Sequence, residues 1–260
     1  MSELRVILAL ARNDFSYFFR TKWLMAILLS LNISDMLVVA LVYNRIIPPE
    51  EGYFSYFVPA VVVMGLFAAS MDTGRRIWLA LREGVIQYEL SLPVSTHGLV
   101  IAYLLAGGAA ALVYSGSLLV IALIVLPAQA IWSALMLLPF LFVLAMGLAG
   151  IAATLAAVAS THGEFFFAFQ NIVQVALLTL STVYYPLKFI QNYLPSFLVA
   201  IVASNPLSLA AEALREYTFA GAPIALDLLI KILAASIPFT VIGAFAYLSA
   251  LRKLRVEGKL

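Results

Sequence analysis

The 260-residue chain has no cysteine, so it can form no disulfide, thiolate metal site or cysteine nucleophile. Charge is also scarce. Charged residues make up 11% of the sequence, against about 25% in an ordinary soluble domain, whereas hydrophobic residues make up 64% and the mean hydropathy is +1.06. The net charge of +2 is too small for the basic surface that nucleic-acid phosphates require. The composition predicts an integral membrane protein and argues against a water-soluble enzyme and a nucleic-acid partner.

Patterns that carry catalysis are lacking too. The two histidines, His97 and His162, fall in predicted cytoplasmic loops, and no H-E-x-x-H metal motif is present. The chain contains no G-x-x-x-x-G-K-[ST], whose backbone amides cradle phosphates, and no G-x-S-x-G nucleophile turn. We therefore predict a chain that is not catalytic by itself, binds no metal or cofactor of its own and hydrolyses no ATP alone.

Long uncharged stretches dominate what is present. A transmembrane helix needs roughly 20 mainly apolar residues to cross about 30 Å of hydrocarbon. Only Asp35 interrupts the first such stretch, and a turn at residues 127–129 divides a run without Asp, Glu, Lys or Arg over 90–161. The sequence predicts an all-α protein with one transmembrane domain, 1–260. Its six predicted spans are residues 23–43, 53–74, 98–126, 131–160, 165–185 and 223–251.

Two further segments are apolar without being spans. Within 186–221, the longest clean apolar stretch is 196–204, whose nine residues rise only about 13 Å as a helix. We expect short outer re-entrant helices there, with their backbone covered by protein. Residues 1–20 carry apolar residues at helical spacing and a stripe with Arg5 and Arg12, which predicts an amphipathic helix in the cytoplasmic interface. A plain cytoplasmic extension of the first span is the open alternative.

The distribution of Lys and Arg predicts the orientation. With six spans and both termini cytoplasmic, the outer side holds four of these residues: Arg45, Lys188, Arg215 and Lys231. The inner side holds eleven: Arg5, Arg12, Arg20, Lys22, Arg75, Arg76, Arg82, Arg252, Lys253, Arg255 and Lys259. This asymmetry follows the positive-inside rule. We expect a multi-pass protein of a prokaryotic plasma membrane, surrounded by membrane lipids.

The cytoplasmic connection 75–97 is far longer than a hairpin turn requires. An apolar face built from Ile77, Trp78, Leu81, Val85 and Tyr88, opposite several charges, predicts an amphipathic helix on the membrane surface or in a groove of a partner. The segment Leu92-Pro93-Val94-Ser95 ends that helix, and Ser95 or Thr96 can cap the next span.

The pattern Arg82-Glu83-Gly84, then Glu89-Leu90-Ser91-Leu92-Pro93-Val94-Ser95 and a long apolar helix, resembles the first intracellular loop of the membrane subunits of ABC transporters of the type-2 permease class. A second stretch is similar to the outer re-entrant segment of that family. It contains Tyr184-Tyr185-Pro186-Leu187, Tyr193-Leu194-Pro195, Asn205-Pro206-Leu207 and Glu212-Ala213-Leu214-Arg215. One departure is Ser181-Thr182-Val183, which lacks the Ser-Gly pair frequent there in the family.

The resemblance implies a half-transporter that pairs with a second copy or a related permease and sits on two copies of a separate ATP-binding subunit, where ATP and Mg would bind. It implies outward transport of an amphipathic or lipid-linked compound along the first, second and fifth spans. The matching residues for ATPase coupling are Glu83, Gly84, Gln87, Tyr88, Glu89, Leu92, Pro93, Val94 and Ser95, with Glu164 as a minor second contact. The matching residues for the path or gate are Tyr185, Pro186, Pro195, Asn205, Glu212 and Arg215. Ordinary solvated loops remain the alternative at both cytoplasmic positions.

Polar residues inside the predicted spans are the remaining candidates. Asn32 and Asp35 are one helical turn apart, so we expect both on one side of the first span, where Asp35 could line a substrate path, stabilise a dimer or bond within the subunit. Local ion pairs are expected for Asp72 with Arg75 and Arg76, for Asp227 with Lys231, and among Glu212, Arg215 and Glu216. An ATP-independent carrier or channel that uses Asp35 is the alternative function.

Overall fold

The computed structural model describes residues 3–46, 52–159 and 163–258, with only the backbone described at 163–164. The described part is helical throughout, as predicted, and contains no strand. Five helical stretches are long and apolar enough to cross a membrane. They are α2–η1–α3 (Lys22–Ser34, Asp35–Val39 and Ala40–Ile46), α4 (Tyr53–Arg82), α6 (Thr96–Val125), α7 (Ile131–Val158) and α12 (Leu226–Val256).

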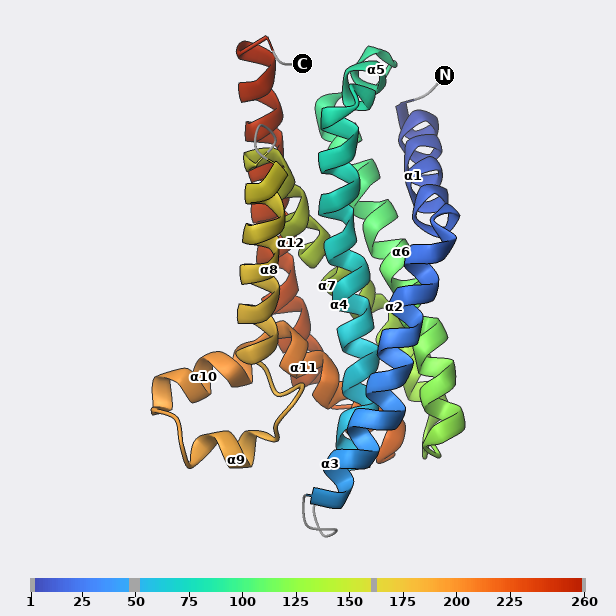
Figure 1. The fold of residues 1–260 in the computed structure, drawn as a ribbon, viewed down its shortest axis with the longest axis vertical. Helices are drawn as coiled ribbons and strands as arrows, with labels where there is room; N and C mark the ends of the chain where they lie inside the picture. Colours follow the sequence, from blue (N-terminus) through green and yellow to red (C-terminus); the bar gives the residue numbers. More distant parts are fainter. Residues whose placement is uncertain (1–2, 47–51, 160–162, 259–260) are drawn as a thin grey trace.

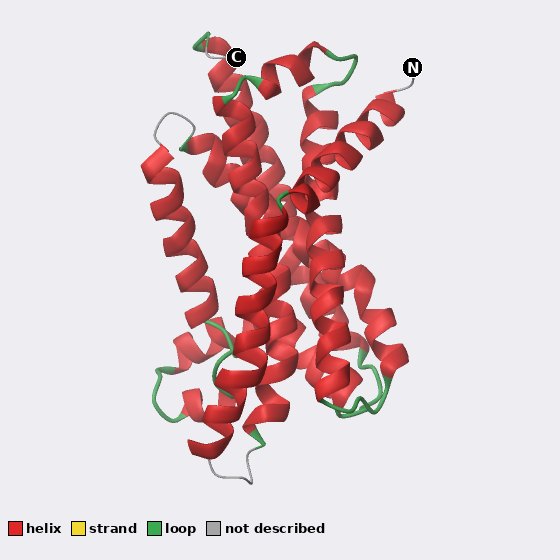
Figure 2. Ribbon diagram, turned by 45° about the vertical axis from the view of Figure 1, so that its right-hand side comes forward, coloured by secondary structure: helices red, strands yellow, loops and turns green. Residues whose placement is uncertain are grey.

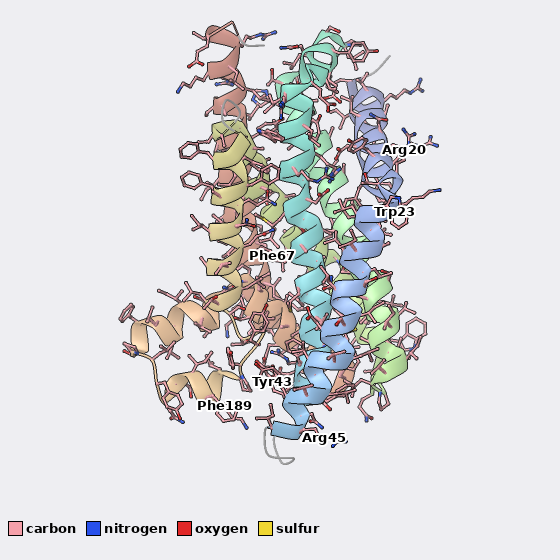
Figure 3. All side chains as sticks on the ribbon, in the orientation of Figure 1. Arg20, Trp23, Tyr43, Arg45, Phe67 and Phe189 are labelled. Carbon is pink, nitrogen blue, oxygen red and sulfur yellow. The ribbon has the colours of Figure 1, made fainter. Side chains whose placement is uncertain are left out.

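These helices form an elongated bundle whose described N-terminal and C-terminal helix ends lie at the same end (Figure 1). Figure 3 labels Trp23 below α1 (Glu3–Arg20), well in from that end, and Arg45 at the opposite end of the bundle. At about 1.5 Å per residue, the stretch between them is about 33 Å long, close to the hydrocarbon thickness of a bilayer. The bundle therefore has the dimensions of a membrane domain.

Helix α4 is the centre of the bundle. In an apolar stretch of 18 residues within α4, 72% of the residues are buried inside the protein. The corresponding shares are 17% for the α2–η1–α3 stretch and 22% for α12. Val61, Leu66 and Phe67 of α4 share one buried cluster with Tyr114 and Leu118 of α6. The helices at the periphery of the bundle leave many apolar side chains uncovered, as expected where lipid or another subunit takes the place of water.

Small residues bring α7 and α12 unusually close together. A Cβ atom added at Gly243 would lie 2.4 Å from the carbonyl carbon of Gly150. The Thr154 hydroxyl donates to the Gly243 carbonyl oxygen at 3.2 Å across the same contact. Close backbone approach through glycine is the usual way in which membrane helices gain packing energy, since burial away from lipid adds little.

The predicted fifth span, 165–185, is wrong in its outer third. Helix α8 (Gly163–Thr179) ends six residues early and, at 17 residues, is shorter than the five spanning stretches. Residues 180–186 follow as irregular backbone. The sequence is apolar enough to continue the helix, but side chains from other elements bind this backbone in place of helical hydrogen bonds.

Short helices occupy the outer connection, as predicted for 186–221. They are α9 (Leu187–Gln191), α10 (Ser196–Ser204), α11 (Pro206–Ala213) and the π-helical η3 (Leu214–Phe219). The stretch from Pro206 to Phe219 is bent by 62° from α10, so the two form either a re-entrant loop or one broken span. Helices α9 and α10 project sideways from the bundle (Figure 1).

The predicted amphipathic helix at the start of 75–97 is also wrong. Helix α4 continues unbroken to Arg82, and Ile77 and Trp78 are buried inside the protein, with the Trp78 ring stacked on Phe166 at 5.9 Å. The chain breaks at Gly84, whose φ of 74° suits glycine, and a separate helix α5 (Val85–Ser91) follows. The apolar face assigned to one surface helix is thus divided between the core and a seven-residue helix.

Helix α1 (Glu3–Arg20) is present where the amphipathic pattern predicts a helix, and only Thr21 separates it from α2. It leaves the line of the bundle at an angle (Figure 2). Val6 and Phe18 are buried against the protein, while Leu4 and Leu8 are exposed. The helix therefore has one face on α6 and an apolar face left uncovered.

Candidate coupling surface and outer cluster

Helix α5 is fixed to the bundle by its inward face. Ile86 is fully buried, and Glu89 is 6% exposed. The Tyr103 hydroxyl of α6 donates to Glu89 Oε2 at 2.8 Å, and the Tyr103 ring meets Tyr247 of α12 edge-on at 6.5 Å. Glu89 was predicted to touch a partner, but its carboxylate faces the bundle and positions α5.

The outward face of the same segment carries the remaining predicted coupling residues. Tyr88 is 68% exposed and is the most prominent side chain on α5. Glu83, Gln87, Pro93 and Ser95 are exposed, whereas Gly84, Leu92 and Val94 are half-buried. The Glu164 side chain lies outside the described residues, as does His162. We call the exposed set Glu83, Gln87, Tyr88, Pro93 and Ser95 the coupling surface.

The start of α6 is capped from two sides. Ser95 Oγ accepts a hydrogen bond from the Gly98 amide at 3.0 Å, as the sequence predicts for this N-cap. The Ser95 amide in turn donates to Glu3 Oε1 of α1 at 3.0 Å. Hydrogen bonding by the Ser95 side chain and by this amide holds the pKa of Glu3 below its usual range. Sequence reasoning missed Glu3, since no local pattern links it to a residue so distant along the chain.

A group of paired charges joins α1 to α4. Arg76 is 3% exposed, lies 3.3 Å from Asp72 and forms an ion pair with Asp14 of α1. Arg75 binds Asp72 at 2.6 Å, so the predicted local pairing of Asp72 is confirmed. Asp14 was missed, although an acidic residue in the middle of a mostly apolar and basic helix is a signal for a buried partner.

A small cavity of 90 Å³ lies between these groups. Asp14, Arg76, Glu83, Glu89 and Tyr103 are among its lining residues. The cavity therefore connects α1, α4, α5 and α6 through side chains that are charged or strongly polar. Any movement of α5 changes the surroundings of these charges.

Protonation of Glu89 is expected to stabilise the protein. Burial raises the pKa of Glu89 above its ordinary value of 4.5, against a smaller lowering by the Tyr103 hydroxyl. A carboxyl group whose pKa is higher in the folded state contributes stability that is complete below about pH 4.5 and is lost as the pH rises through the folded value. Glu89→Gln keeps an acceptor for Tyr103 and removes the charge, so the fall in Tm between pH 5 and 8 should become shallower.

Thermal unfolding of the detergent-solubilised protein over this pH range measures the effect. Glu83→Gln is the matched control, because Glu83 lines the same cavity but is exposed. An equal pH slope for Glu89→Gln and the unaltered protein would show that Glu89 is not titrating in this range.

The end of the bundle opposite the two chain termini, which the sequence predicts to be the outer one, is organised around Arg215 of η3, which is 8% exposed. Its guanidinium donates to the carbonyl oxygens of Tyr56 at 2.8 Å and of Thr182 at 3.0 Å, and lies 3.5 Å from the centre of the Tyr56 ring. It also binds Glu212 at 3.2 Å, so that predicted pair is confirmed. We call Tyr56, Thr182, Glu212 and Arg215 the outer cluster.

Further side chains bind the irregular backbone at residues 180–186 and the end of α8. Asn205 donates to the carbonyl oxygens of Leu177 at 2.9 Å and Leu180 at 2.6 Å, while its own Oδ1 caps α11 by accepting from the Leu207 amide. The Tyr53 hydroxyl donates to the Tyr184 carbonyl oxygen at 3.0 Å. Backbone groups that leave a helix at membrane depth need such partners, so these contacts explain where α8 ends.

Of the other predicted gate residues at this end, Pro186 lies beside the outer cluster, whereas Tyr185 and Pro195 do not line its cavity. Tyr185 is 55% exposed, Pro186 is half-buried just before α9, and Pro195 is exposed just before α10. Pro186 and Glu212 do line one cavity with Tyr56 and Thr182. Asn205 and Arg215 therefore act through the backbone they hold, and Tyr185 and Pro195 lie at the surface.

Asn32 and Asp35 differ in burial and in partners. Asn32 is buried and donates to the Tyr114 hydroxyl of α6 at 3.0 Å, so it bonds within the subunit. Asp35 is half-exposed at the start of the π-helical turn η1, and within the described ranges no hydrogen bond or ion pair is seen for its carboxylate. The widened turn changes the helical phase from Asp35 onward.

Two other expectations concern charge and metals. The predicted pair of Asp227 and Lys231 is confirmed at 3.1 Å, and both side chains are exposed. Across the part of the chain that the structure describes, no group of three His, Asp or Glu residues could hold a metal ion.

The comparison with known families agrees with this architecture. The family model described as ABC-2 type transporter matches residues 5–219, from the first turn of α1 to the end of η3. No curated protein matches the chain. The match covers well over half of the sequence and includes α1, the α5 region and the outer cluster, so the chain belongs to the ABC-2 type transporter family, as a transmembrane component that is not itself catalytic.

Proposed function

We propose that the chain is the membrane subunit of an ATP-driven exporter, working as a dimer with two copies of a separate ATP-binding subunit. The observation that carries the proposal is the exposed Tyr88 on a helix whose other face is fixed by Ile86 and Glu89. Such a helix can transmit a push to α4 and α6 as a rigid body, since only residues 83–84 and 92–95 separate it from them.

The uncovered faces of the bundle favour pairing of two permease chains. Ile27, Leu31 and Val38 are exposed on the first span, which has the smallest buried share of the five spanning stretches. We propose that α2, α4 and α8 line the path between two copies, with the outer cluster as the external gate. The apolar walls of this path would suit an amphipathic or lipid-like compound. We infer the outward direction of transport from the family resemblance.

Co-purification tests the assembly. The chain is isolated from its native membrane in mild detergent and the masses of the bound proteins are determined. We expect two permease chains and two soluble subunits that carry a phosphate-binding G-x-x-x-x-G-K-[ST] loop. A cross-linked native sample that contains no ATPase would contradict the proposal.

Tyr88→Ala tests the coupling surface. Exposed aromatic side chains often supply about 2 kcal/mol or more at a protein interface. We therefore expect the affinity for the ATP-binding subunit to fall about 10- to 30-fold, with loss of stimulated ATP hydrolysis and unchanged folding. Tyr193→Ala is the control, because Tyr193 is 85% exposed between α9 and α10, at the opposite end of the bundle. Equal coupling in the two variants would rule out Tyr88 as a contact.

One observation favours the second candidate function, an ATP-independent carrier or channel. Asp35 is a carboxylate in a spanning segment, at a π-helical turn of the kind often found at functional sites. Under that function, Asp35→Asn abolishes transport while Tyr88→Ala leaves it unchanged. Under the exporter proposal, Tyr88→Ala reduces transport.

A further inference from the structure

A cavity of 410 Å³ opens at the outer end of the bundle, beside the outer cluster. It lies where α4, α9, α10, α11 and the start of α12 meet. Its walls include Leu187, Leu209 and Leu228, and its volume falls in the range of small-molecule binding sites. Tyr56, Thr182 and Glu212 of the outer cluster line it, so the cavity lies at the proposed gate, and the roles argued above assign no ligand to it.

Hydrogen-bond donors gather in the wall of this cavity. Thr182 is 4% exposed, and its hydroxyl has no hydrogen-bond partner among the described residues. Ser208 accepts from the Thr182 amide at 2.8 Å through its oxygen, which leaves the hydroxyl proton for another acceptor. A buried polar group without a partner is costly, so an oxygen-rich ligand at this point would satisfy it.

The cavity also carries one side chain of each charge. Lys188 of α9 supplies an ammonium group. Glu212 of α11 supplies a carboxylate whose side chain is 46% exposed and is paired with Arg215 through Oε2 at 3.2 Å, which leaves Oε1 for a ligand. Hydroxyl and ammonium groups together are donors for phosphate oxygens, whereas the carboxylate accepts from a ligand ammonium. The polar groups therefore match a zwitterion with phosphate at one end and a protonated amine at the other.

The surroundings fit a membrane lipid better than a soluble compound. Phe189 of α9 is 37% exposed, and Phe197 and Ile201 of α10 are 64% and 46% exposed, on the two helices that project from the bundle (Figures 1 and 3). Aromatic side chains are typical of the membrane interface, and apolar ones beside the opening would contact acyl chains.

We propose that this cavity binds the headgroup of an outer-leaflet phospholipid of the phosphoethanolamine type. Thr182, Ser208 and Lys188 bind the phosphate, and Glu212 binds the ammonium group. The acyl chains lie along α9 and α10. The inference concerns binding alone and holds whether or not an ATP-binding subunit drives transport.

The test uses the purified full chain in detergent, without any partner, and measures lipid retention by native mass spectrometry. Phosphatidylethanolamine, phosphatidylcholine and phosphatidylglycerol with identical acyl chains are compared. We expect phosphatidylethanolamine to bind at least 5-fold more tightly than the others, because a quaternary amine cannot donate to Glu212 and glycerol carries no charge for it. Thr182→Val and Lys188→Gln should each weaken this binding at least 5-fold.

Lys231→Gln is the control, since Lys231 is exposed near the same end of the bundle and pairs with Asp227. Lys188→Gln alters an exposed side chain, so it keeps the test valid should Thr182→Val fold poorly. Equal binding of the three lipids, or unchanged binding in Lys188→Gln, would overturn the proposal. Saturable binding of free phosphoethanolamine as tight as that of the lipid would identify a soluble ligand and overturn the lipid assignment.

Discussion

Replacement of Arg215 by methionine is expected to lower the free energy of unfolding by about 3–5 kcal/mol, the range found when one partner of a buried ionic contact is removed. Arg215 donates to the carbonyl oxygens of Tyr56, Thr182 and Val183 and binds Glu212. Methionine has a similar length but donates to none of them. The end of α8 then loses hydrogen bonds that water cannot replace at a buried position, so folding should fail or the Tm should fall sharply.

Thermal unfolding in detergent, with the yield of monodisperse protein, measures this effect. Lys231→Met is the matched control, because it also breaks an ion pair with a carboxylate three or four residues away, but on the exposed surface. Exposed pairs of this kind contribute about 0.3–0.5 kcal/mol. If both variants melt within one degree of the unaltered protein, Arg215 does not hold the outer connection.

Gly243→Ala is the second substitution with a large expected effect. The new methyl group would lie 2.4 Å from the carbonyl carbon of Gly150, a separation that no real Cβ contact shows and that only a shift of α7 against α12 can relieve. Overpacking of a close contact costs about 1–3 kcal/mol, and the shift would also break the hydrogen bond from Thr154 to the Gly243 carbonyl. We expect a loss of about 2–3 kcal/mol in unfolding free energy.

Gly116→Ala provides the comparison, because no heavy atom lies within 4 Å of its added Cβ and it is also helical. Alanine is the better helix former by about 1 kcal/mol, so this variant should be as stable as the original protein or slightly more so. Unfolding in detergent, followed by circular dichroism, compares the two. A Gly243→Ala protein as stable as Gly116→Ala would mean that α7 and α12 are not tightly packed.

Close glycine contacts mark the rigid part of the bundle and distinguish it from the helices that are free to move. Helix α7 is in close contact with both α4, where a Cβ at Gly74 would lie 2.7 Å from the Ala152 carbonyl oxygen, and α12 at Gly243. The first span and α8 have few buried residues, and each makes polar contacts with the rest of the bundle, such as those of Asn32 with Tyr114 and of Gln170 with the Met71 carbonyl. Relative motion in transport is therefore expected at α2 and α8.

Prediction from sequence succeeded where a property is carried by many residues at once. The membrane class and the approximate positions of α4, α6, α7 and α12 depend on the summed hydropathy of apolar runs long enough to span a bilayer, and single residues change such sums little. Pairs within one helical turn, such as Asp72 with Arg75 and Asp227 with Lys231, were also correct because helix geometry places them together.

The errors arose where distant side chains compete with local preference. Residues 180–185 are apolar enough to extend α8, yet Asn205 and Arg215 bind their carbonyl groups from more than 20 residues away. Ile77 and Trp78 have the spacing of a surface helix, yet Phe166 of α8 covers Trp78. Glu89 has the charge of a partner contact, yet Tyr103 draws it inward.

The sequence by itself determined that this chain is a multi-spanning membrane protein, since a bilayer selects apolar helices by composition and length alone. It also determined the local order of helices, turns and capping residues, most of which lie within the matched residues 5–219. Only the tertiary structure decided that Asp14 pairs with Arg76, that Glu89 faces inward, and that Arg215 ends a helix on another part of the chain. The physical reason is that a polar group buried inside the protein needs a partner, and which partner is within reach depends on how the helices pack.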